Sequence, residues 1–177
     1  HLVDQIDENI VIFNPLNESN SIDSDIEVVP SWELDNENTN SLDTLFEEII
    51  THHISTLVIQ FNYGFFNLNE LKQLLKKIKF HKINIIIFFH STIDPIKNPL
   101  KSLSSIRDSL ELCDRLMVHT ISDLNRLKSL NLIDNVCLFP HGILDFNPVK
   151  SNPFSLSRLK KIKKSRRICS YGFCLPN

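Results

Sequence analysis

The chain has 177 residues, of which 42% are hydrophobic and 23% charged, and its formal net charge at pH 7 is -2. This length provides one substantial domain, or one domain and the beginning of another, and it excludes two complete domains. The composition excludes a disordered chain, and no apolar run approaches the length of a bilayer span. The near-neutral net charge predicts little about partners, because acidic residues in the first fifty positions offset a basic stretch, Arg158–Arg167.

Short apolar runs alternate with helix-patterned segments, which is typical of βαβ units and a parallel sheet. The expected strands are Asn9–Phe13, Thr56–Phe61, Asn84–Phe89, Arg115–His119, Asn135–Phe139 and Arg167–Tyr171, with a further short strand near Glu27–Val29. The run Ile85–Phe89 is apolar at every position, so both of its faces should be covered by helices. The sequence therefore predicts an α/β fold with a Rossmann-like, doubly wound parallel sheet.

Helices are expected between these strands. The clearest one carries apolar residues at helical spacing, namely Leu68, Leu71, Leu74, Leu75 and Ile78. Asn67 can cap its start, with Glu70 three residues on. A short helix is expected to begin at Ser122, and weaker helical patterns cover Ser41–Thr51 and Leu103–Leu112.

The two ends of the chain suggest a fold that is truncated at both ends. Residues 1–146 are expected to form one Rossmann-like domain without its first strand, because His1–Ile6 resembles the tail of a helix. Residues 147–165 have the composition of a linker, with Pro148 and Pro153 followed by basic residues. Residues 166–177 are expected to be the first strand and loop of a second Rossmann-like domain.

The candidate site lies just after the strands, since an open parallel sheet binds ligands beyond the carboxyl ends of its strands. Three of the seven histidines fall there: His90, His119 and His141. The other candidates at these ends are Asn62, Gly64, Phe65, Ser91, Thr92, Thr120 and Gly142. Imidazole both donates and accepts hydrogen bonds, which suits hydroxyl and phosphate groups. The structural alternative for each histidine is a hydrogen bond to backbone at a strand end.

Other chemistries are less well supported. No His-Glu-x-x-His or paired Cys-x-x-Cys motif is present, so we expect no metal, and no Gly-rich phosphate loop is complete. The basic stretch Arg158–Arg167 could contact acidic lipid head groups or nucleic acid, but a solvated face is the simpler interpretation. Four cysteines without a Cys-x-x-Cys pair favour reduced thiols in the cytoplasm.

Four segments in order resemble the N-terminal domain of group 1 glycosyltransferases with the GT-B fold. They are VIQFNYGFF at 58–66, IIFFHST at 86–92, CDRLMVHTISDLNRLKSLN at 113–131 and NVCLFPHGI at 135–143. SYGFCLPN at 170–177 looks like the first strand and loop of the family's C-terminal domain. The resemblance runs from about Thr56 to the end of the chain.

This resemblance implies transfer of a sugar from a nucleotide-sugar donor to an acceptor, in a cleft between two domains and without a bound metal or other cofactor. It implies that His90 faces the transferred sugar as the catalytic residue. It also implies that Gly64 and Phe65 line the acceptor side and that Gly172 lies near the donor diphosphate. The acceptor would be a glycan, a lipid or a small molecule, with no nucleic-acid partner and with weak membrane-surface contact possible through Arg158–Arg167.

The chain also departs from the family pattern. These 177 residues lack the glycine-rich loop that follows the family's first strand, and they lack the carboxylate-bearing motif of its second domain. We therefore expect the 177-residue polypeptide to be inactive alone. The main alternative is a non-catalytic binding or scaffolding module with a degenerate transferase fold. A small-molecule hydrolase is a third reading, which suffers from the lack of a Gly-x-Ser-x-Gly elbow.

Overall fold

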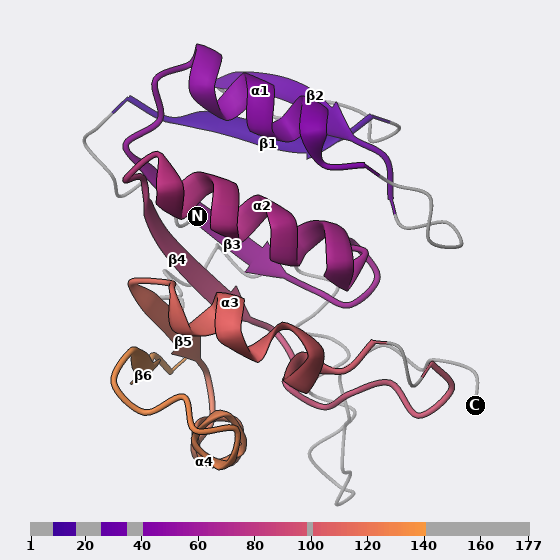
Figure 1. Ribbon diagram of the computed structural model, residues 1–177, viewed down its shortest axis with the longest axis vertical. Helices are drawn as coiled ribbons and strands as arrows, with labels where there is room; N and C mark the ends of the chain where they lie inside the picture. Colours follow the sequence, from indigo (N-terminus) through magenta and orange to yellow (C-terminus); the bar gives the residue numbers. More distant parts are fainter. Residues whose placement is uncertain (1–8, 17–25, 35–40, 99–100, 141–177) are drawn as a thin grey trace, which may run out of the picture. The chain divides into compact units, whose positions relative to one another are not determined.

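The computed structural model describes residues 9–16, 26–34, 41–98 and 101–140, and within them the strands form two parallel sheets. Strand β1 (Val11–Pro15) pairs with β2 (Glu27–Trp32). The larger sheet has the order β3-β4-β5-β6, as Figure 1 shows. Its strands are β3 (Thr56–Phe61), β4 (Asn84–Phe89), β5 (Arg115–Val118) and β6 (Val136–Leu138). The α/β class with a parallel sheet is confirmed, and this architecture is consistent with a Rossmann-like domain.

The helices alternate with the strands. They are α1 (Asp43–Thr51), α2 (Leu68–Phe80), the short 3-10 helix η2 (Leu103–Ile106), α3 (Arg107–Glu111) and α4 (Ile121–Ser129). Helix α2 forms as predicted: its five apolar positions are buried, and the side chain of Asn67 accepts hydrogen bonds from the amides of Asn69 and Glu70. None of the helices in the described part of the chain is long and apolar enough to cross a bilayer.

Several boundaries differ from the prediction. The helix expected from Ser122 begins one residue earlier, because Thr120 is its cap: the hydroxyl of Thr120 accepts a hydrogen bond from the amide of Asp123 at 3.1 Å. Strand β5 ends before His119, and β2 extends three residues beyond the expected Val29.

Strands β1 and β6 and the helix expected at Leu103–Leu112 also differ. Strand β1 is shifted two residues toward the C-terminus, β6 is one residue shorter at each end, and η2 and α3 divide the helix. The expected linker and the expected strand Arg167–Tyr171 lie outside the described residues.

Helices α2, α3 and α4 cover one face of the larger sheet. The strands follow one another in chain order, and right-handed crossovers between them place every connecting helix on the same side. Buried Leu57, Ile59 and Phe61 alternate along β3 with the exposed Val58 and Gln60 of the opposite face. The described residues therefore show one helical layer, and the second layer that double winding requires is not among them.

Three helices end in the same way, with a non-glycine residue in the left-handed conformation. His53, Lys82 and Asn131 have φ values of 52°, 61° and 59°. In α2, the Lys82 amide donates to the Lys79 carbonyl and the Ile83 amide to the Ile78 carbonyl, which is the Schellman pattern. Equivalent hydrogen bonds follow α1 and α4. Each motif turns the chain sharply toward the next strand.

Candidate functional site

The carboxyl edge of the larger sheet brings His90 and His119 together. The register pairs Phe89 with Val118, so the next residues, His90 and His119, are level with each other. Their ring centroids are 5.7 Å apart. Phe88 packs against His119 at 6.5 Å and against Phe139 at 5.6 Å. We call Gln60, Phe88, His90, His119 and Phe139 the histidine cluster; two of the three predicted histidines are therefore neighbours.

Hydrogen bonds orient both imidazole rings. Nε2 of His90 lies 2.8 Å from the amide oxygen of Gln60, and Nδ1 of His119 lies 2.8 Å from the carbonyl oxygen of Phe139. Both oxygens can only accept, so each of these ring nitrogens carries the proton. In the neutral rings the lone pairs are therefore on Nδ1 of His90 and Nε2 of His119. Nε2 of His119 is buried, whereas His90 is exposed, so His90 is the ring of the pair that a hydroxyl group of a ligand can approach.

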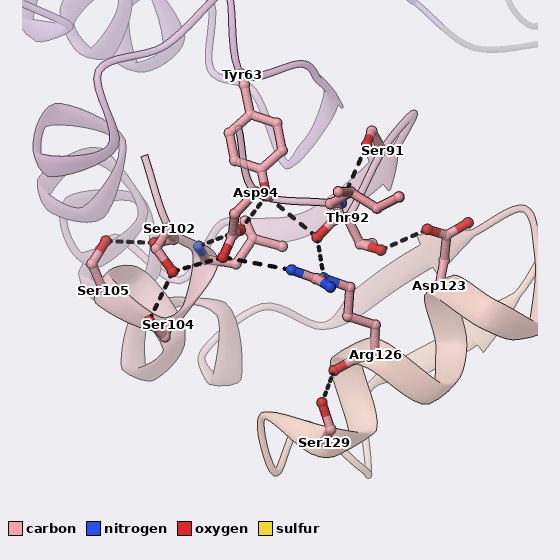
Figure 2. A network of polar contacts seen from close by, with 12 residues as sticks. Tyr63, Ser91, Thr92, Asp94, Ser102, Ser104, Ser105, Asp123, Arg126 and Ser129 are labelled. Atoms are coloured by element: carbon pink, nitrogen blue, oxygen red, sulfur yellow. Dashed lines mark hydrogen bonds and ion pairs between the residues drawn. The ribbon is translucent and has the colours of Figure 1, made fainter. Parts of the chain in front are cut away.

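A second set of polar contacts fixes the loop after β4, as Figure 2 shows. The hydroxyl of Tyr63 donates to Asp94 at 2.7 Å, and that of Ser102 donates to the same carboxylate at 2.8 Å. Arg126 donates from Nε to the Thr92 carbonyl at 2.6 Å and lies 3.6 Å from Asp94. The hydroxyl of Thr92 donates to Asp123 at 2.6 Å. We call Tyr63, Thr92, Asp94, Ser102, Asp123 and Arg126 the loop network.

The two carboxylates of the loop network remain ionised at neutral pH. Burial acts to raise the pKa of Asp94, but hydrogen bonds from Tyr63, Ser102 and the Leu103 amide, with the charge of Arg126, lower it below its ordinary value. Burial likewise acts to raise the pKa of Asp123, but hydrogen bonds from Thr120 and Thr92 lower it below its ordinary value. These groups therefore act as hydrogen-bond acceptors that hold the loop and not as acids.

Three further predicted residues, Asn62, Gly64 and Phe65, lie in the turn after β3. The side chain of Asn62 accepts a hydrogen bond from the Gly64 amide at 2.9 Å, which closes the turn after β3, and Gly64 is exposed. Phe65 is half-buried and packs on the core through Phe66.

Ser91, Thr92 and Thr120 take part in local hydrogen bonding. The hydroxyl of Ser91 accepts from the Ile93 amide at 3.2 Å, and Thr120 caps α4. Thr92 is completely buried, and both its hydroxyl and its carbonyl are hydrogen-bonded. Its position indicates a role in shaping the loop.

Three predicted site residues, His141, Gly142 and Gly172, lie outside the described residues, as does the basic stretch Arg158–Arg167. Within the described ranges, no group of three or more His, Cys, Asp or Glu side chains could hold a metal ion. Lys101, at 2.6 Å from the Tyr63 carbonyl, adds a further support to the same edge.

Sequence reasoning missed Gln60 and most of the loop network. Gln60 did carry a signal, because it is a polar residue within an apolar strand and directly precedes that strand's last residue. Asp94, Arg126 and Asp123 carried none, since single charged residues are common in loops and on helix surfaces.

Comparisons of the chain with protein-family models, with curated proteins and with solved structures each gave no match. The interpretation of this site therefore depends on its own geometry and on the residue patterns described above.

Proposed function

We propose that this chain is the acceptor-side half of a glycosyltransferase that uses a nucleotide-sugar donor. The observation that carries the proposal is the pair of oriented imidazoles, His90 and His119, at the carboxyl edge of a parallel sheet. Such edges bind ligands in open α/β sheets, and an exposed imidazole held in one orientation, that of His90, suits a hydroxyl group of a sugar. The order of the motifs that resemble group 1 glycosyltransferases supports the same assignment.

In the proposed reaction, an acceptor hydroxyl forms a bond to the anomeric carbon of the donor sugar while the bond to the nucleoside diphosphate breaks. The diphosphate leaves with the electron pair of the broken bond, and the hydroxyl proton of the acceptor passes to an oxygen of the departing diphosphate. The neutral imidazole of His90 accepts a hydrogen bond from the transferred sugar and stabilises charge that develops there. Gln60 holds the ring in the orientation and tautomer that this requires.

The turn after β3 supplies the acceptor side in this proposal. Gly64, four residues after Gln60, is exposed and offers backbone without a side chain, while half-buried Phe65 offers an aromatic surface. The reaction would take place in the cytoplasm.

The test is a panel of nucleotide sugars with the complete polypeptide. We expect at least one nucleotide sugar to bind and to release its nucleoside diphosphate, with faster release when an acceptor is added. Residues 1–177 alone should show no turnover. Failure of the complete protein to bind any nucleotide sugar would favour the non-catalytic binding module, and turnover by residues 1–177 would contradict the half-site interpretation.

A further inference from the structure

The two-stranded sheet formed by β1 and β2 depends on packing for its stability. A sheet of only two strands is marginally stable at best by itself. Its half-buried apolar residues are Val11, Ile12, Phe13, Val28 and Val29. Helix α1 packs against β2, as Figure 1 shows. Elements with few fully buried apolar side chains open locally at a low cost in free energy, so one contact with α1 can control how often this sheet opens.

His52, which directly follows α1, contacts both strands of this sheet. Its Nε2 lies 3.5 Å from Oε1 of Glu27, the first residue of β2. Its ring meets the ring of Phe13 in β1 edge to face, with the centroids 5.9 Å apart. On the helix side, Nδ1 lies 2.8 Å from the carbonyl oxygen of Glu48 and 3.4 Å from the carboxylate of the same residue. His52 therefore links α1 to β1 and β2.

The surroundings of the His52 ring favour its charged form. The Glu48 carbonyl can only accept, so Nδ1 carries a proton, and in a neutral ring the lone pair of Nε2 then faces the carboxylate of Glu27. A second proton, on Nε2, replaces this repulsion with an ion pair. Among the described residues, the titratable groups that face the ring are the two carboxylates, Glu27 from β2 and Glu48 from α1, while β1 contributes the uncharged Phe13.

The same contacts raise the pKa of His52 above its ordinary value of 6.5. The hydrogen bond to the Glu48 carbonyl is the largest cause, and the carboxylates of Glu27 and Glu48 add to it, while burial acts in the opposite direction. A pKa raised in the folded arrangement means that the stabilising contribution is complete below about pH 6.5 and is lost as the pH rises above that value.

We propose that His52 is a pH-dependent link, which fastens the sheet of β1 and β2 to α1 when the ring is protonated and loosens it when the ring is neutral. Trp32, at the end of β2, stacks on Phe66 with the ring centroids 5.9 Å apart. Loosening of β2 therefore also affects the segment that follows β3. The link does not depend on the proposed sugar transfer.

Hydrogen exchange of the backbone amides measures the opening. Protection factors, corrected for the intrinsic exchange rates, are compared between about pH 5.5 and about pH 8.5, since imidazole titrates between these values. We expect the protection factors of β1 and β2 to fall about two- to fivefold as the pH rises, which is the range that a partly exposed ion pair provides. The amides of α2, whose apolar face is fully buried, are the internal reference and should keep their protection.

Two substitutions of histidine test the assignment to His52. His52→Gln removes the titrating group, so the protection of β1 and β2 should lose its pH dependence. The matched control is His81→Gln, because His81 follows α2 as His52 follows α1, with Nδ1 2.9 Å from the Lys77 carbonyl. Among the described residues its ring packs against two phenylalanine rings and not against a carboxylate, so His81→Gln should keep the pH dependence of the original chain.

Glu27→Gln tests the ion pair without changing the histidine. Glu27 is exposed, so the substitution should preserve the fold, lower the pKa of His52 in an NMR titration of its ring protons and weaken the pH dependence of protection. Protection of β1 and β2 that does not change with pH in the original chain would overturn the link. So would the full pH dependence in His52→Gln, or its equal loss in His81→Gln. Absence of sugar transfer would contradict the proposed function and leave the exchange result unaffected.

Discussion

At the scale of single residues, a substitution at Gly64 distinguishes a functional role of this glycine from a structural one. Its φ is not in the left-handed region, and an added Cβ would meet only Asn62 Oδ1, at an ordinary 3.5 Å. Gly64→Ala should therefore leave the free energy of unfolding unchanged or raise it by up to about 1 kcal/mol. If an acceptor approaches this backbone, turnover by the complete protein falls. Thermal denaturation and turnover measure the two effects, and unchanged turnover would remove Gly64 from the acceptor side.

Tyr63 makes a prediction about alkaline pH. Burial, and then the hydrogen bond to Asp94, raise the pKa of Tyr63 well above its ordinary value of 10.0. A raised pKa in the folded state means that the stability contributed by this group is complete below pH 10 and is lost as the pH rises above that value. Tyr63→Phe should cost about 1 kcal/mol at neutral pH through the lost hydrogen bond.

Denaturant titrations at several pH values test this. The original chain should lose stability above about pH 10 more steeply than Tyr63→Phe does. Tyr171→Phe removes the only other tyrosine and serves as the control. If the free energy of unfolding fell with pH equally in the original chain and in Tyr63→Phe, the Tyr63 phenol would not contribute to the pH dependence of stability.

At the scale of elements, a substitution in the Schellman motif that ends α2 should make the fold more stable. Lys82 has a φ of 61°, a conformation that costs about 1 kcal/mol or more for residues other than glycine. Lys82→Gly should therefore raise the free energy of unfolding by up to about 1 kcal/mol. Lys76→Gly, at an exposed position inside the same helix, should lower it by about 1 kcal/mol. Destabilisation by both substitutions would contradict the assigned role of Lys82.

The C-terminal ends of the helices were difficult to predict from the sequence. A glycine usually marks a helix C-terminus, but this chain has only three glycines and ends α1, α2 and α4 with histidine, lysine and asparagine. The helix starts were easier to predict, because Asn67 has the side chain of a cap and a clear apolar pattern follows it. For α4 the two neighbouring hydroxyls, Thr120 and Ser122, made the start ambiguous by one residue.

At the scale of the whole molecule, the parallel sheet could be predicted because apolar runs and helical patterns alternate along the chain. That architecture also places strand ends at one edge, so the proximity of His90 and His119 followed from their positions. The loop network could not be predicted. Its contacts join residues 31 and 34 positions apart, as between Tyr63 and Asp94 or Thr92 and Arg126, and nothing local in the sequence specifies such pairs.

The proposed contact between His90 and the transferred sugar is tested most directly by the turnover of the complete protein carrying His90→Ala. His81→Ala is the matched control, because His81 is an exposed histidine that follows α2, next to the amino ends of the strands. We predict that His90→Ala lowers kcat/KM by about 100-fold or more and leaves the melting temperature unchanged, while His81→Ala leaves kcat/KM unchanged. Turnover by His90→Ala close to that of the original protein would contradict the assignment and leave His90 a structural residue.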